Sequence, residues 1–125
     1  MSDEEFEHLV FETIDGLPHE FREKLDNVAV TIADQPTLQQ MRQLRLRPWT
    51  LLFGLYEGVS LQGRASNYTS ILPDKITIFK QPILSLSQDP DAIKDHVRSV
   101  VLHEIAHHFG FSEQRIREVE SRSHS

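Results

Sequence analysis

The chain has 125 residues, of which 38% are hydrophobic, and this length and composition predict one domain with one core over residues 1–125. It contains no cysteine, which excludes disulfide bonds and a zinc site built on thiolates. The formal net charge of −6 argues against a nucleic-acid partner, because phosphate binding needs a basic surface. The acidic start MSDEEFEHLV and the lack of an apolar run of about 20 residues predict a cytoplasmic protein without a membrane span.

Two helices are predicted at the N-terminus. Ser2 and Glu5 form the pattern of a capping box, and the apolar residues that follow recur at helical spacing. This pattern predicts a helix over about residues 3–15, which ends at Gly16. A short second helix is predicted to begin at Pro18, since proline suits the first helical position.

Three segments have the patterns of strands. Residues 27–34 and 75–79 alternate apolar and polar side chains, as a half-buried strand does, and a proline at position 82 is expected to close the latter. Residues 51–56 form a continuous apolar run, which predicts a strand buried on both faces, and Gly54 indicates close backbone packing there. Residues 57–74 are predicted to be a long loop that could contain a short edge strand.

A basic cluster lies between the first two predicted strands. Residues 37–44 favour a short helix, and Arg42, Arg45 and Arg47 fall on this helix and on the turn after it. We predict that the cluster is a solvated helix face, which is the usual role of such a run of charge.

The C-terminal third is predicted to be helical. Asp89 followed by a proline is typical of a helix start and predicts a helix over about residues 90–108. Ser112 can cap a final helix over about residues 113–120, and residues 121–125 are predicted to be a frayed tail. The fold class is therefore predicted to be α+β, with N-terminal helices, a short C-terminal helix and a short mixed sheet of about three to four strands packed on the long helix.

The most informative motif is HEIAHHFGFSE, which runs from His103 to Glu113. Residues four apart lie on one helix face, so His103 and His107 can donate nitrogens to a single Zn²⁺. Glu104 would sit beside this ion, where a carboxylate can act as a general base. Gly110 can adopt positive φ and turn the chain back, which makes Glu113 the candidate third ligand.

The motif also has a purely structural interpretation. Its histidines can be polar residues on a half-buried helix, and Glu113 can be an acid placed at a helix start by the helix dipole. Glu118 and Glu120 are the alternative third ligands, whereas His108 points about 100° away around the helix and is not expected to reach the same ion. The remaining histidines are predicted to be ordinary surface residues: His8, His19, His96 and His124.

The chain resembles the zincin metallopeptidases, and specifically the small bacterial zincin-like domains. The resemblance covers the motif and three blocks, residues 51–61, 72–79 and 100–111. The extended motif is similar to that of the metzincins, HExxHxxGxx followed by a ligand. The chain departs from them because Glu113 stands where they usually have His or Asp, and because both methionines precede the motif, so no Met-turn follows it.

The resemblance implies a zinc-dependent peptidase that holds one Zn²⁺ through His103, His107 and Glu113 and uses Glu104 as general base. Its partner would be a peptide or protein substrate, and we expect a monomer. An extended substrate could pair with an exposed strand edge, for which residues 75–79 or the loop before them are the candidates. Three residues could supply a second donor to the oxyanion: Tyr56, Arg64 and Tyr68.

Other functions remain open at this point. A zinc-stabilised protein-interaction module would keep the site without catalysis, although Glu104 would then have no chemical task. Metal-dependent endoribonucleases share the His-x3-His-x2-Gly-x2-His spacing, but they lack a glutamate at the position of Glu104 and bind RNA. A scaffold or storage protein without any metal is the remaining alternative.

Overall fold

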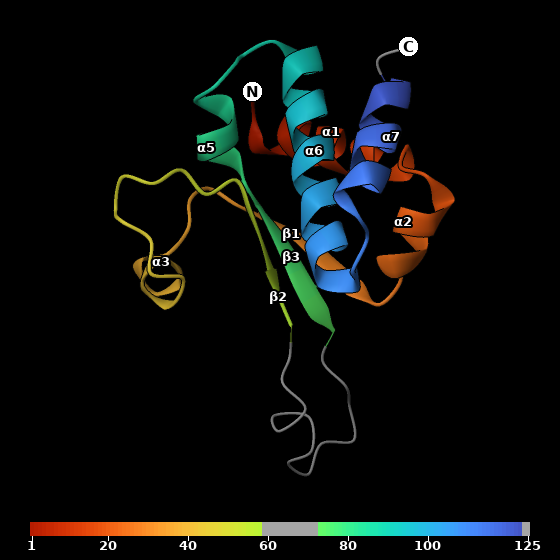
Figure 1. Cartoon of the computed structure of the whole chain (residues 1–125). Helices are drawn as coiled ribbons and strands as arrows, with labels where there is room; N and C mark the ends of the chain where they lie inside the picture. The colour runs from red at the N-terminus through yellow and green to blue at the C-terminus, as the bar shows by residue number, and fades with distance from the viewer. Residues whose placement is uncertain (59–72, 124–125) are drawn as a thin grey trace.

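The structure is a computed structural model that describes residues 1–58 and 73–123. Within them, helices lie on both sides of a small sheet (Figure 1). One side carries four helices, α1 (Asp3–Asp15), α2 (His19–Lys24), α6 (Pro90–Phe109) and α7 (Glu113–Ser123). The other side carries α3 (Leu38–Gln43). This arrangement confirms the predicted α+β class with its long helix, N-terminal helices and short C-terminal helix.

Both predicted N-terminal helices are present. The capping box of α1 forms, since the Ser2 hydroxyl accepts from the Glu5 N–H at 3.1 Å and the Glu5 carboxylate accepts from the Ser2 N–H at 3.2 Å. Helix α1 then buries Phe6 and Val10 and packs on α6. In α2, Phe21 is buried and its ring stacks on that of Phe111, with the centroids 4.5 Å apart.

The described residues form one sheet of three strands, β1 (Val28–Ala33), β2 (Gly54–Glu57) and β3 (Asp74–Phe79), in the order β1-β3-β2. Strand β3 pairs parallel to β1, with Val28 opposite Asp74, and antiparallel to β2, with Gly54 opposite Ile78. Ile76 and Ile78 in the central strand are fully buried. The mixed sheet agrees with the predicted size and pairing.

Two expectations about the strands are wrong. The apolar run at residues 51–56 is not a strand buried on both faces, because β2 begins only at Gly54, is the last strand on its side of the sheet among the described residues and is mostly half-buried. The run is apolar because Leu51, Leu52 and Phe53 line a cleft beside α6. Residues 75–79 are not an exposed edge either, because β1 and β2 pair with both sides of β3.

The segment after β3 also differs from the prediction. The strand ends at Phe79 and is followed directly by the helix α5 (Lys80–Leu84), which was not predicted. Pro82 lies in the first turn of this helix, where its missing N–H is not needed, and therefore does not close the strand. The Lys80 side chain is buried and its Nζ lies 2.6 Å from Asp3 Oδ1, which ties the start of α5 to α1. The short edge strand that the predicted loop at residues 57–74 could contain falls within residues 59–72, which lie outside the described residues.

Helix α6 runs through the centre of the domain. Its start is capped by Asp89, whose carboxylate accepts from the Asp91 N–H at 3.4 Å, and it ends at Gly110, which has φ of 80°. It packs on α1, α2, α5, α7 and β2. Helix α7 extends to Ser123, beyond the predicted end at residue 120, and residues 124–125 lie outside the described part. The apolar core of the domain is formed mainly by buried side chains of α1, β3 and α6: Phe6, Val10, Ile76, Ile78, Ile93, Val97, Val101, Leu102 and Ile105.

No helix in residues 1–58 or 73–123 combines the length and apolar character needed to cross a membrane.

Candidate metal centre

Helix α6 presents His103 and His107 on one face near its C-terminal end. Their ring centroids lie 6.4 Å apart with the ring planes at 77°. The His103 side chain is 38% exposed and that of His107 is 70% exposed, so both imidazoles are accessible from solvent. The spacing that suggested a shared ligand set therefore places both rings on one accessible face.

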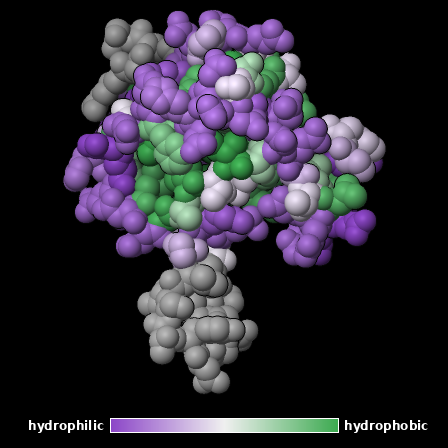
Figure 2. All heavy atoms as spheres, turned by 180° about the vertical axis from the view of Figure 1, so that it is seen from behind, coloured by the Kyte–Doolittle hydropathy of each residue, from purple (hydrophilic) through white to green (hydrophobic). Residues whose placement is uncertain are grey.

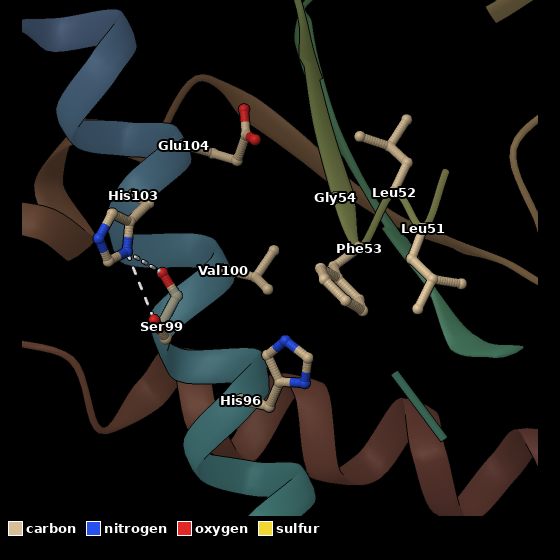
Figure 3. A pocket seen from close by; sticks show the side chains of 9 residues that line it. All are labelled: Leu51, Leu52, Phe53, Gly54, His96, Ser99, Val100, His103 and Glu104. Carbon is tan, nitrogen blue, oxygen red and sulfur yellow. Dashed lines mark hydrogen bonds between the residues drawn. The ribbon is translucent and has the colours of Figure 1, made fainter. Parts of the chain in front are cut away.

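One ring nitrogen of His103 is held by its surroundings. Nδ1 lies 2.8 Å from the carbonyl oxygen of Ser99 and 3.4 Å from its hydroxyl, as the dashed lines in Figure 3 show. Because a carbonyl oxygen only accepts, Nδ1 carries the hydrogen and Nε2 keeps its lone pair. Glu120 Oε1, in α7, accepts from the Ser99 hydroxyl at 3.3 Å and lies 3.6 Å from Nδ1. Such contacts orient metal-binding histidines in known zinc sites.

Glu104 points from α6 toward the segment 51–54, as do Val100 and His96 (Figure 3). Its Oε2 accepts a hydrogen bond from the backbone N–H of Tyr56 at 3.2 Å. Burial raises the pKa of the Glu104 carboxyl, while the Tyr56 N–H and the two nearby imidazoles partly offset this rise. A carboxyl with a raised pKa is suited to take up and release a proton near neutral pH.

The three candidate third ligands have different surroundings. Glu113 is the first residue of α7 and its Oε1 lies 3.9 Å from His107 Nε2. Glu118 pairs with Arg115 at 3.1 Å. Glu120 lies on the Nδ1 side of His103, which is the side opposite the free nitrogen. Of the three, Glu113 is the one whose carboxylate lies beside the His107 ring.

A cleft of about 290 Å³ is lined by residues of α6 and by the segment that leads into β2. One wall is the apolar run from Leu51 to Gly54, and the other wall includes His103, Glu104 and Val100. Gly54 allows this close approach, because a Cβ added there would lie 2.5 Å from Val100 Cγ1. The close packing expected at Gly54 is therefore confirmed.

His96 is not an ordinary surface residue, contrary to the sequence-based expectation. It lines the same cleft, and its ring meets the edge of Phe53 with centroids 4.5 Å apart. Burial lowers the pKa of His96. His8 and His19 are exposed, as predicted, and His124 lies outside the described residues.

A second polar cluster lies behind Glu104 and was not predicted. The Tyr56 hydroxyl donates to Asp74 Oδ2 at 2.7 Å, and its ring stacks on that of His108 with centroids 3.8 Å apart. His108 Nε2 lies 3.8 Å from the same Asp74 oxygen. The Tyr56 hydroxyl proposed as an oxyanion donor is thus bonded to Asp74. The other two candidates, Arg64 and Tyr68, lie outside the described residues.

The donors present agree with a zinc site in their chemistry. In the described part of the chain no three His, Asp or Glu side chains stand close enough together to hold an ion as they lie. His103 nevertheless offers a free Nε2, His107 follows one turn later, and Glu113 lies beside His107, which are nitrogen and oxygen donors typical of zinc. His107 and Glu113 are 70% and 62% exposed, so both side chains have room to rotate toward a shared ion.

Comparisons with known proteins indicate the family of the chain. No curated protein matches the chain. A family model described as zincin-like metallopeptidase matches residues 25–123, which contain the whole sheet, the cleft and the HEIAHHFGFSE motif. The chain therefore belongs to the zincin-like metallopeptidase family.

Proposed function

We propose that this protein is a zinc-dependent peptidase that hydrolyses peptide bonds in a protein or peptide substrate. The observation that carries the proposal is the cleft itself, in which Glu104 points from α6 toward residues 51–54 and His103 lines the same cleft (Figure 3). Family membership supports the same chemistry.

In this proposal His103, His107 and Glu113 hold the ion. When bound, zinc polarises the scissile carbonyl and lowers the pKa of a water toward about 7. Glu104 accepts the proton of the attacking water and delivers it to the leaving amine, for which its raised pKa is suited. Ser99 and Glu120 keep the His103 ring in the orientation that leaves Nε2 free.

The edge strand offers a place for an extended substrate. The Phe53 carbonyl accepts from the Phe79 N–H at 2.9 Å, so the backbone of Phe53 faces β3. Residues of an antiparallel pair alternate between facing the partner and facing away, which directs the backbone groups of Gly54 and Tyr56 outward. The Tyr56 N–H is bonded to Glu104, whereas the outward groups of Gly54 can pair with a peptide strand.

The test combines metal content with cleavage. We expect the purified chain to hold one zinc ion and to cleave an unstructured protein such as casein, and a chelator to abolish cleavage. Glu104→Gln keeps shape and hydrogen bonding, so it should retain zinc and lose about two to four orders of magnitude in rate. Equal rates for wild type and Glu104→Gln would disprove the proposed role of Glu104.

One observation favours a second candidate, a zinc-stabilised interaction module without catalysis. Glu104 already has a structural contact, because it accepts the Tyr56 N–H and so joins α6 to β2. If wild type and Glu104→Gln both hold zinc and neither cleaves any member of a broad peptide library, the module replaces the peptidase.

A further inference from the structure

A second surface precedes the cleft residues in the chain and is not used by the chemistry proposed above. It consists of Arg42, Arg45, Arg47 and Trp49, and we call it the arginine–tryptophan surface. All four side chains are exposed, and Trp49 is 72% exposed, which is unusual for so large an aromatic ring. Figure 2 shows hydrophobic side chains beside strongly hydrophilic ones at the edge of the molecule where α3 lies. The apolar neighbours in this region are Leu38, Leu44 and Leu51.

The positive charge of this surface is not neutralised by the fold. In the described part of the chain, no carboxylate lies within ion-pair distance of the three arginines. The acid that contacts α3 is Glu57, and it is bonded instead to Gln40 at 3.2 Å and lies 3.9 Å from Lys75. A chain with 19 acidic and 13 basic residues thus has three arginines within residues 42–47 that have no acidic partner among the described residues.

The arrangement of Arg47 and Trp49 is suited to binding. The Arg47 guanidinium lies over the Trp49 ring at 5.4 Å from the centroid. Stacking uses the face of the guanidinium and leaves its N–H donors free at the edges, where a carboxylate binds in a bidentate manner. The pair therefore offers an apolar plane and a carboxylate-binding edge side by side.

The arginine–tryptophan surface and the cleft are joined by a short stretch of chain. Trp49 precedes the cleft residue Leu51 by two positions, which limits their separation to about 7 Å. Leu51 precedes Tyr56, which contacts Glu104, by five positions, or at most about 18 Å of chain. A peptide that lies along this segment would meet Trp49 about five to seven residues from the bond next to Glu104.

We propose that the arginine–tryptophan surface binds an acidic segment of the protein substrate that also carries an apolar side chain, about five to seven residues from the cleaved bond. The carboxylates of the segment pair with the arginines, and its apolar side chain covers Trp49 and Leu51. This proposal rests on the proposed peptidase for the nature of the partner. Its test uses binding alone, so the two proposals can fail separately.

Trp49 is the chain's single tryptophan and therefore a built-in probe. The full chain, held in chelator to prevent turnover, is titrated with twelve-residue peptides that carry two Glu and one Leu in either the first or the second half. Matched peptides replace both Glu by Gln, or Leu by Ser. We expect the acidic–apolar peptide to shift Trp49 emission to the blue in one of the two orientations, and either replacement to weaken binding.

The charge contribution is tested with matched double variants. Arg42→Gln/Arg47→Gln should weaken peptide binding about three- to thirtyfold, as expected for two exposed ion pairs. Arg45 is left unchanged, because its φ of 57° makes a substitution there a test of the turn itself. The control Arg22→Gln/Arg117→Gln changes net charge equally with exposed arginines of α2 and α7 and should bind as wild type does.

Several results would overturn the proposal. These are no response to the peptide in either orientation, equal binding of the Glu and Gln peptides, or equal loss in both double variants. Tighter binding of a single-stranded RNA oligonucleotide than of the acidic peptide would assign the surface to nucleic acid instead. Concentration-dependent dimerisation that is lost in Arg42→Gln/Arg47→Gln would assign it to a second copy of the chain. If peptide binding behaves as expected while no cleavage is found, the proposed peptide-binding surface is supported and the proposed peptidase activity is refuted.

Discussion

The backbone N–H of Tyr56 in β2 donates a hydrogen bond to the side chain of Glu104 in α6 over 3.2 Å. This contact requires the edge strand and the helix to lie close together. Gly54 makes the approach possible, since a Cβ at this position would meet Val100 Cγ1 at 2.5 Å. The close packing of Gly54 against Val100 thus helps to fix the position of Glu104, the proposed general base.

We predict that Gly54→Ala forces β2 away from α6 and costs about 1–3 kcal/mol of unfolding free energy, as overpacking in a close contact does. Urea unfolding measures the loss. Gly58→Ala is the control, because a Cβ there would meet its nearest atom at 3.7 Å, which is ordinary contact. Val100→Ala removes the clashing methyl group, so the double variant Gly54→Ala/Val100→Ala should be more stable than the sum of the single changes predicts. Simple additivity would refute this explanation.

The two histidines should carry the metal. His103→Ala and His107→Ala are each predicted to lose stoichiometric zinc in elemental analysis, because either change leaves too few protein donors for a stable site. The melting temperature of the wild-type chain should fall when a chelator is added, since zinc that binds only the folded state stabilises it. Full zinc occupancy in either variant would show that the ligand assignment is mistaken.

Glu113 should be distinguished from a mere helix-start acid by its effect on zinc. If Glu113 is a ligand, Glu113→Gln should lower zinc affinity at least about tenfold in a competition assay with a chromogenic chelator. If Glu113 is only an acid at the start of α7, the same substitution should cost about 0.3–1 kcal/mol of stability and leave zinc affinity unchanged. Measuring both quantities on the same variant decides between the two roles.

Glu120 should act on zinc through His103. Its Oε1 lies 3.6 Å from His103 Nδ1, so we predict that Glu120→Gln weakens zinc binding about ten- to hundredfold. Glu118→Gln is the matched control on the same helix, because Glu118 pairs with Arg115 instead. Nitrogen NMR of the zinc-free chain adds a separate measurement, since the Nδ1–H form of His103 should become less populated only in the Glu120 variant. An identical zinc affinity in both variants would exclude this role.

His96 should make the stability of the zinc-free chain depend on pH. Burial lowers the pKa of His96 in the folded state below the usual value of about 6.5. The unfolded chain then binds more protons in the window below about 6.5, so stability is lost as the pH falls through the folded-state pKa. Urea unfolding between pH 5 and pH 8 should show a shallower loss for His96→Asn than for wild type. His19→Asn, at an exposed site, should leave the slope unchanged.

All the described helices except α5, and the common face of the two motif histidines, could be predicted from the sequence because their signals are local. The capping box of Ser2 and Glu5, the N-cap Asp89 and the positive φ of Gly110 each act within a few residues of the chain. In the same way the spacing of His103 and His107 fixes their common helix face without reference to the rest of the protein. Where such a signal was ambiguous, as at Pro82, the prediction failed.

Tertiary structure decided everything that depends on which segments become neighbours. An apolar run such as residues 51–56 has the same composition whether it lies at the centre of a sheet or along a cleft, and only the pairing order shows that β2 is the outer strand of the three described. The contacts of Tyr56 with Asp74, and of Glu120 with Ser99 beside His103, join residues 18 and 21 positions apart. Sequence spacing contains no signal for such pairs, because packing of separate elements, rather than backbone geometry, brings them together.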